Sequence, residues 1–186
     1  MFIIEESIQK WAPNMKYYAF DWDDNIVYMP TEIILLDNHD DEVGMSTHDF
    51  AKYRSEIGKN TFKYRGTNIV GYAQNPFRQF REEGDENFLN DIMIAKRGPA
   101  FNDFKEAINN GSIFSIITAR GHNPNTLKEG VKKYIKKGFF DINQNKLIYN
   151  LEKYRDLIPS DDNEDIVDQY LEFHKMYLKE STVLNE

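Results

Sequence analysis

The chain has 186 residues, 40% of them hydrophobic and 14% aromatic, which is enough for one sizeable domain or for one domain with a small insert. Its formal net charge of -8 argues against general binding to nucleic acids or to membrane surfaces, so we expect neither partner. The absence of cysteine excludes disulfides, thiolate metal sites and a cysteine nucleophile. Glu5 and Glu6 stand where a secretory signal would have its basic start, and no apolar run is long enough to span a bilayer. These features predict a cytoplasmic protein.

The first half of the chain predicts a strand followed by hairpins and helices. Residues 16–22 are aromatic and compact, as in a buried strand. Residues 31–47 and 62–73 each predict a hairpin, and residues 48–58 between them predict a helix. Residues 75–99 have a mixed pattern, part of it helical.

The second half alternates between helices and a strand. Residues 100–111 predict an amphipathic helix, residues 112–121 a short apolar strand with a polar loop, and residues 123–140 a second helix. A parallel sheet needs this alternation, because its strands are buried on both faces. Residues 145–180 predict two helices that are broken at Pro159.

Three acidic residues, Asp21, Asp23 and Asp24, follow the first strand directly. Like charges this close raise one another's pKa unless a cation neutralises them. Side chains two residues apart share a face, so Asp21 and Asp23 are expected to lie together at the carboxyl end of the strand, with Trp22 in the core. Two carboxylates there suit Mg²⁺, or a division between a nucleophile and a proton donor.

Two other interpretations of this acidic stretch stay open at this point. In the first interpretation, the stretch is an exposed acidic turn. In the second it is a calcium loop, because Asp21, Asp23, Asn25 and Glu32 occupy the first, third, fifth and twelfth positions of an EF-hand pattern. However, Ile26 stands where that loop needs glycine, and an EF-hand would require a helix before Asp21.

The second strand ends in a candidate phosphate loop. Thr118 closes the apolar run and is followed by Ala119, Arg120 and Gly121. A hydroxyl and free backbone N–H groups after a strand can hold phosphate oxygens, and Arg120 could add a charge-assisted contact. A helix-capping turn is the alternative. His122 comes next and is expected in a surface loop.

Residues 17–25, Y-Y-A-F-D-W-D-D-N, resemble the first motif of the haloacid-dehalogenase-like (HAD) phosphohydrolases. Residues 113–118, I-F-S-I-I-T, resemble the second motif of that family. The resemblance implies that Asp21 is the nucleophile that becomes an aspartyl-phosphate and that Asp23 is the general acid and base. It also implies that Thr118 binds the phosphate and that Mg²⁺ is held by Asp21 and the backbone carbonyl of Asp23.

The same resemblance implies an α/β fold with a Rossmann-like core and a parallel sheet. The core would comprise residues 1–29 and 100–186, with a helical tail at 150–186, and residues 30–99 would form a cap-like insert. The implied activity is Mg²⁺-dependent hydrolysis of a phosphomonoester, a small phosphorylated substrate for which a nucleotide is one candidate. The sequence also has the character of HAD-like proteins encoded by tailed phages.

The match to the family is weaker at one position of the first motif and in the two downstream motifs. Asn25 stands where threonine or valine is usual in the first motif. The third motif needs a lysine or arginine, for which Lys128, Lys132 and Lys133 are candidates, and among them we assign Lys128 to phosphate binding. The alternative is that these lysines belong to a solvated basic helix face.

The fourth motif, an acidic pair after a buried strand, has one candidate, Asp161–Asp162. The residues before it do not resemble a strand, and Ser160 or Asp161 would also suit the cap of a helix. We therefore expect that the chain is the N-terminal part of a longer protein or a degenerate relative. The alternative function is an incomplete or non-catalytic HAD-like binding module.

Overall fold

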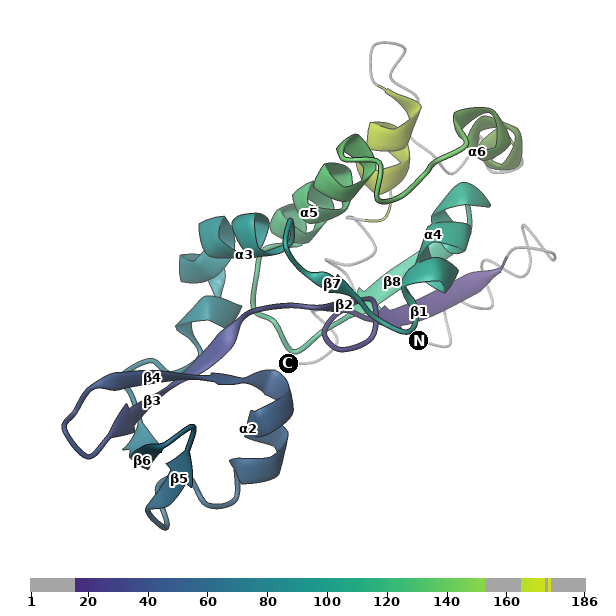
Figure 1. The fold of residues 1–186 in the computed structure, drawn as a ribbon. Helices are drawn as coiled ribbons and strands as arrows, with labels where there is room; N and C mark the ends of the chain where they lie inside the picture. Colours follow the sequence, from purple (N-terminus) through teal and green to yellow (C-terminus); the bar gives the residue numbers. More distant parts are fainter. Residues whose placement is uncertain (1–15, 153–164, 173, 175–186) are drawn as a thin grey trace, which may run out of the picture. The chain divides into compact units, whose positions relative to one another are not determined.

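The computed structural model describes residues 16–152, 165–172 and 174 (Figure 1). The chain is mixed α/β and divides into two compact units. Of the described residues, the first comprises residues 16–28, 96–118, 124–152, 165–172 and 174, and the second comprises residues 29–95 and 119–123. The division expected from the sequence differs from this one at residue 29, at residues 96–99 and at residues 119–123, and the cap role of the insert stays a prediction.

Two short strand pairs belong to the first unit. β1 (Tyr17–Asp21) and β8 (Ile113–Ile117) are parallel, and β2 (Val27–Tyr28) and β7 (Lys96–Arg97) are antiparallel. The prediction that the first strand is buried is wrong for most of β1, in which only Phe20 is buried. The β-branched and aromatic residues of β8 are buried as far as Ile116.

The helices of the first unit are α4 (Phe101–Asn109), α5 (Pro124–Lys136), α6 (Gln144–Leu151) and a helical segment at residues 166–172. α4 lies beside the β1–β8 pair (Figure 1), where the ring of Phe104 contacts Phe20 and Phe114 edge-on. Tyr134 of α5 packs edge-on against Phe101. The core of this unit is therefore built from aromatic side chains, in agreement with the aromatic-rich sequence.

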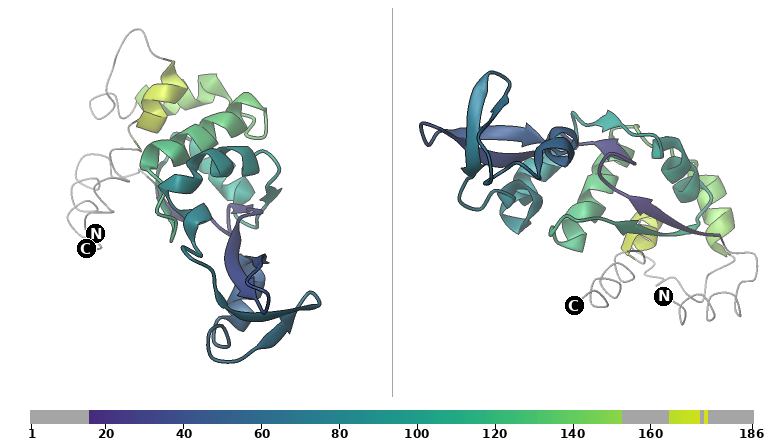
Figure 2. Two further views of the ribbon diagram at one scale, coloured as in Figure 1. Left: turned by 90° about the vertical axis from the view of Figure 1, so that its left-hand side faces the viewer. Right: turned by 90° about the horizontal axis from the view of Figure 1, so that it is seen from below.

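The second unit is built on a four-stranded antiparallel sheet with the order β4-β3-β6-β5, seen from two further sides in Figure 2. Its strands and helices are β3 (Glu32–Asp37), β4 (Glu42–Ser46), α2 (Thr47–Tyr53), β5 (Phe62–Tyr64), β6 (Thr67–Tyr72) and α3 (Asp85–Asp91), with short 3-10 helices η1 (Arg78–Phe80) and η2 (Glu82–Gly84) before α3. Buried aliphatic and aromatic side chains between the sheet and α2 form its core. Both predicted hairpins are confirmed, and so is a helix between them, although α2 ends at Tyr53 and the prediction extended it to residue 58.

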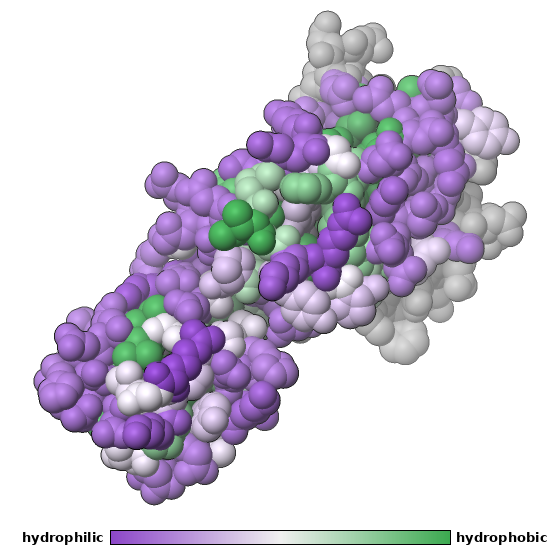
Figure 3. All heavy atoms as spheres, viewed as in Figure 1, coloured by the Kyte–Doolittle hydropathy of each residue, from purple (hydrophilic) through white to green (hydrophobic). Residues whose placement is uncertain are grey.

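The sheets in the described part of the chain are small and mostly antiparallel, and the parallel ladder is confined there to β1 and β8. No helix among the described residues has both the length and the apolar character needed to cross a membrane. The face drawn in Figure 3 is mainly hydrophilic, with apolar residues in limited groups. Asp161–Asp162 and Pro159 lie outside the described residues, as does much of the predicted helical tail.

Candidate functional site

The acidic loop begins where β1 ends. Asp21 is the last residue of β1 and is exposed, whereas Trp22 is completely buried in the core, as predicted. The loop folds back on itself, because Ile26 N–H donates to the Asp21 carbonyl (3.2 Å) and Val27 N–H donates to the Trp22 carbonyl (3.1 Å). Ile26 and Val27 are buried too, so apolar side chains hold the loop while Asp23 stays half-buried. The strand before Asp21 excludes the EF-hand interpretation.

A second segment closes the acidic loop from the other side. Gly98 N–H donates to the Ile26 carbonyl (2.8 Å), and Ala100 N–H donates to the Asn25 carbonyl (2.9 Å). A Cβ atom at position 98 would overlap the Asn25 carbonyl oxygen, so only glycine allows this approach. Asp24 adopts a positive φ of 58°, a conformation that aspartate and asparagine tolerate better than most residues.

The electrostatics of the loop centre on Asp21. Although Asp21 is exposed as a residue, partial desolvation of its carboxyl raises the pKa of that group, and the neighbouring Asp23 and Asp24 carboxylates raise this pKa further. A hydrogen bond from the Trp22 backbone N–H lowers it in part. A cation beside these carboxylates would relieve the repulsion and favour the ionised form of Asp21, which is the form a nucleophile needs.

Thr118 lies at the same edge of the strand pair as the acidic loop. β1 and β8 are parallel, and Asp21 pairs in register with Ile117, the residue before Thr118. Both strands therefore end together, and the structure brings Asp21 and Thr118 to neighbouring strand ends. Thr118 is half-exposed and Ala119 is exposed. Carboxyl ends of parallel strands are the usual place for ligands in open α/β sheets.

Arg120 lies inside the second unit, where it is only 6% exposed. Its Nη2 donates to Thr31 Oγ1 (2.8 Å), and its Nη1 lies 3.3 Å from His122 Nε2. The guanidinium carbon lies 4.8 Å from the ring centroid of Phe80 and 5.3 Å from that of Phe88. These contacts are all with the protein itself, so the phosphate contact of Arg120 stays a prediction.

His122 is 7% exposed, so the expectation of a surface position is wrong. Its Nδ1 lies 2.6 Å from Asp85 Oδ1, and its ring centroid lies 4.8 Å from that of Phe88. Because Arg120 can only donate, Nε2 of His122 accepts, and Nδ1 carries the hydrogen that it donates to Asp85. Burial raises the pKa of Asp91, and the nearby charge of Arg120 opposes part of this rise.

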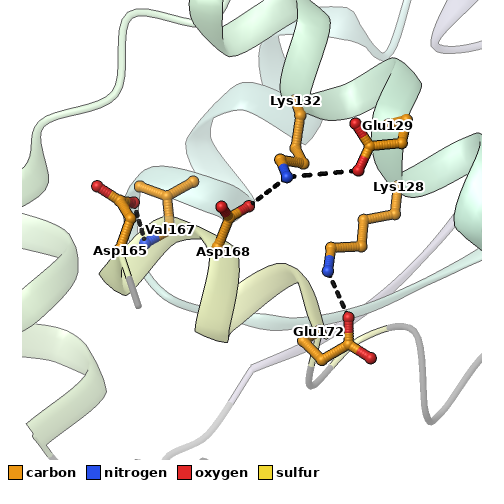
Figure 4. A network of polar contacts seen from close by, with 7 residues as sticks. All are labelled: Lys128, Glu129, Lys132, Asp165, Val167, Asp168 and Glu172. Carbon is orange, nitrogen blue, oxygen red and sulfur yellow. Dashed lines mark hydrogen bonds and ion pairs between the residues drawn. The ribbon is translucent and has the colours of Figure 1, made fainter. Parts of the chain in front are cut away.

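Lys128 and Lys132 of α5 make ion pairs with the helical segment at residues 166–172 (Figure 4). Lys128 Nζ donates to the Glu172 carboxylate, and Lys132 Nζ lies 2.8 Å from Asp168 and 3.3 Å from Glu129. The hydrogen bond to Asp168 is the main reason why the pKa of Lys132 is raised. A solvated basic face is therefore the wrong interpretation for Lys128 and Lys132. Phosphate binding by Lys128 stays a prediction and would require its ammonium to share or leave Glu172.

The acidic pair proposed for the fourth motif lies outside the described residues. Within the described ranges, histidine and acidic side chains form no group of three or more that is placed to hold a metal ion. Mg²⁺ is commonly held by one or two carboxylates, with water and substrate phosphate oxygens completing its shell. The Asp21 carboxylate and the Asp23 backbone carbonyl would suit such an ion, because the charge repulsion at Asp21 is what a cation would relieve.

No protein-family model, curated protein or solved structure matches this chain. The site is therefore interpreted from its own residues. Sequence patterns missed the cluster of Arg120, His122, Asp85 and Thr31, because its members are up to 91 residues apart and share no local period. They also missed Gly98, whose only local signal is the Gly98–Pro99 pair.

Proposed function

We propose that the chain is a Mg²⁺-dependent HAD-like phosphohydrolase that cleaves a small phosphomonoester, with nucleotides among the candidate substrates. The observation that carries this proposal is the parallel register of β1 and β8, which ends one strand at Asp21 and the other just before Thr118. The proposal includes a Rossmann-like core around this strand pair, a cap role for the insert at residues 30–99, and a cytoplasmic location.

In the proposed reaction, a carboxylate oxygen of Asp21 attacks phosphorus in line with the ester oxygen. The bond from phosphorus to the ester oxygen breaks, and Asp23 gives its proton to the leaving alcohol. Ionised Asp23 then accepts a proton from water, and the water oxygen attacks phosphorus. The Asp21–phosphorus linkage breaks, which releases inorganic phosphate and restores the Asp21 carboxylate.

The remaining groups bind and orient the phosphoryl group. The Thr118 hydroxyl and the backbone N–H groups that follow it would donate to the phosphoryl oxygens, where catalysis depends mainly on positioning and charge. Mg²⁺, when bound by the Asp21 carboxylate and the Asp23 carbonyl, would neutralise charge on the phosphoryl oxygens. The half-buried position of Asp23 suits a group that alternates between its acid and its conjugate base.

The test is hydrolysis of a generic aryl phosphate by the full chain, with and without Mg²⁺. Asp21→Asn removes the nucleophile and is expected to lower kcat by about a thousandfold or more. Asp24→Asn is the matched control, because Asp24 is an exposed neighbouring carboxylate to which the mechanism gives no role. It should retain Mg²⁺-dependent activity.

Two results would contradict the proposal. Activity retained in Asp21→Asn would assign the chemistry to another group. A folded wild-type chain without Mg²⁺-dependent hydrolysis would favour the alternative, an incomplete or non-catalytic HAD-like binding module. Circular dichroism of each variant would establish that it is folded.

A further inference from the structure

Positive charge is concentrated in one stretch of the second unit. Residues 52–66 contain five lysines and arginines and one glutamate, a net charge of +4 in a chain of net charge -8, so the rest of the chain carries -12. All five basic residues are exposed: Lys52, Arg54, Lys59, Lys63 and Arg65. The net charge of the chain, which argues against general binding to nucleic acids, therefore does not describe this stretch.

Two of these cations share one carboxylate. Lys52 Nζ lies 3.9 Å from Asp49 Oδ1, and Arg65 Nη2 lies 3.8 Å from Asp49 Oδ2. The side chains of Lys52 and Arg65 are 59% and 64% exposed, so both ion pairs are solvated and weak. Asp49 neutralises only one of the two charges and also accepts a hydrogen bond from the Tyr64 hydroxyl (2.9 Å). A phosphate can therefore approach either cation without breaking a strong contact.

Aromatic rings lie among these cations. The rings of Tyr53, at the end of α2, and Phe62, in β5, are stacked with their centroids 5.0 Å apart. Both residues are half-buried, so part of this ring pair reaches the surface. Tyr53 also meets Tyr64 edge-on, and the Arg65 guanidinium lies over the Tyr64 ring, 5.0 Å from its centroid. Cations beside partly exposed rings are the combination with which proteins bind the phosphates and unpaired bases of single-stranded nucleic acids.

The backbone at Arg65 gives a separate indication. Arg65 and Gly66 form the two-residue turn between β5 and β6, with φ values of 48° and 92°. Asparagine or aspartate usually takes the first position of such a turn, because most other side chains are strained at positive φ. The stability of the turn therefore does not explain this arginine, whereas a binding role at the exposed tip does.

Lys63 differs from the other cations in its direction. Neighbouring side chains of a strand point to opposite faces of the sheet, so Lys63 lies on the other face from Phe62 and Tyr64. It also has a different explanation, because β5 is an edge strand and lysine there discourages pairing with another sheet. Lys63 therefore carries the same charge on the same strand but lies away from the ring pair.

We propose that the second unit binds single-stranded nucleic acid through a basic patch formed by Lys52, Tyr53, Phe62 and Arg65. Lys52 and Arg65 bind phosphates, and an unpaired base stacks on the ring pair. The exposed cations of residues 54–59 add to the positive potential that attracts the strand. The proposal concerns the second unit by itself and does not depend on the proposed hydrolysis.

The test is binding of a fluorescent oligothymidylate of about 15 nucleotides to the full chain, followed by anisotropy at rising salt concentration. The two phosphate contacts predict that the logarithm of the binding constant falls with the logarithm of the salt concentration, with a slope of about -1.4 or steeper. A strand of the same length without bases should bind about fivefold more weakly or worse, because it cannot stack on the ring pair.

Two variants separate the basic patch from the charge of the unit as a whole. Arg65→Asn should weaken binding by about fivefold or more at low salt and make the slope shallower by about 0.7. Asparagine suits the turn better than arginine does, so this loss would not arise from misfolding. Lys63→Gln is the matched control, since it removes one charge from the opposite face, and it should bind within about twofold of wild type.

Absence of binding at protein concentrations up to about 1 mM at low salt would overturn the proposal. Equal weakening in Arg65→Asn and Lys63→Gln, or equal affinity for the strand without bases, would overturn it too. Binding to phosphatidylserine vesicles without binding to the oligonucleotide would assign the basic patch to a membrane surface instead. An oligouridylate of the same length is measured in parallel, and tighter binding of either strand supports the proposal and identifies DNA or RNA as the better ligand.

Discussion

His174 gives the fold a pH dependence that can be measured directly. The side chain is 2% exposed, and its ring stacks on Phe114 of β8 with a centroid distance of 4.0 Å. Its Nδ1 lies 3.0 Å from the Phe114 carbonyl oxygen, to which it donates. Burial lowers the pKa of His174 from 6.5 to about 3, although the hydrogen bond to Phe114 opposes this shift.

The sign and size of the effect follow from proton binding. As the pH falls below 6.5, the unfolded chain takes up a proton at His174, whereas the folded chain takes it up only near pH 3. The unfolded state therefore binds more protons in this window, and stability is lost as the pH falls through it. Since one pKa unit corresponds to about 1.4 kcal/mol, the His174 contribution falls by about 2 kcal/mol from about pH 7.5 to about pH 5.

The assay is urea unfolding of wild type, His174→Gln and His48→Gln at these two pH values. Glutamine keeps an N–H donor for the Phe114 carbonyl but does not titrate. His174→Gln should lose about 2 kcal/mol less stability than wild type over the interval, whatever its stability at the higher pH. His48 is exposed, so His48→Gln should follow wild type. Equal losses in wild type and His174→Gln would refute the reasoning.

Three further variants test the core and the acidic loop. The Tyr134 hydroxyl is buried without a hydrogen-bond partner among the described residues, so Tyr134→Phe should raise the free energy of unfolding by about 1 kcal/mol in urea titrations. A loss of stability would mean that the hydroxyl is bonded. Gly98→Ala places a Cβ against the Asn25 carbonyl, and should lower the free energy of unfolding by about 2 kcal/mol and reduce aryl phosphate hydrolysis. If Gly98→Ala changed neither the free energy of unfolding nor the rate of hydrolysis, the close approach of Gly98 to the Asn25 carbonyl would be contradicted. Asp24→Asn removes a charge that raises the pKa of Asp21. The acidic limb of the pH profile of kcat/KM should therefore move to lower pH. An acidic limb that does not move would count against Asp21 as the ionised nucleophile.

Local structure could be predicted wherever a single segment carries the signal. The hairpin of β5 and β6 turns at Arg65 and Gly66, both with positive φ, as a tight two-residue turn requires. Pro124 begins α5, where its missing N–H leaves no hydrogen bond unmade. These features depend on neighbours in the sequence, so pattern and composition are enough to find them.

The candidate site likewise has features that the local sequence predicts and features that depend on tertiary structure. Its residues Asp21 and Thr118 could be found from the sequence, because each ends an apolar strand. Their meeting at one edge depends on the register of β1 with β8, in which Asp21 pairs with Ile117, 96 residues further along the chain. The sequence suggested this pairing through the resemblance, but tertiary structure supplied the register.

The sequence by itself determined the acidic loop, the apolar strands that carry the candidate site residues, and the turns of the second unit. Only the tertiary structure decided what surrounds Arg120, His122 and Lys128. Their partners are 89, 37 and 44 residues away in the chain, as in the contacts with Thr31, Asp85 and Glu172. Whether a charged side chain meets solvent, substrate or a buried partner depends on such distant contacts, and no local pattern of residues encodes them.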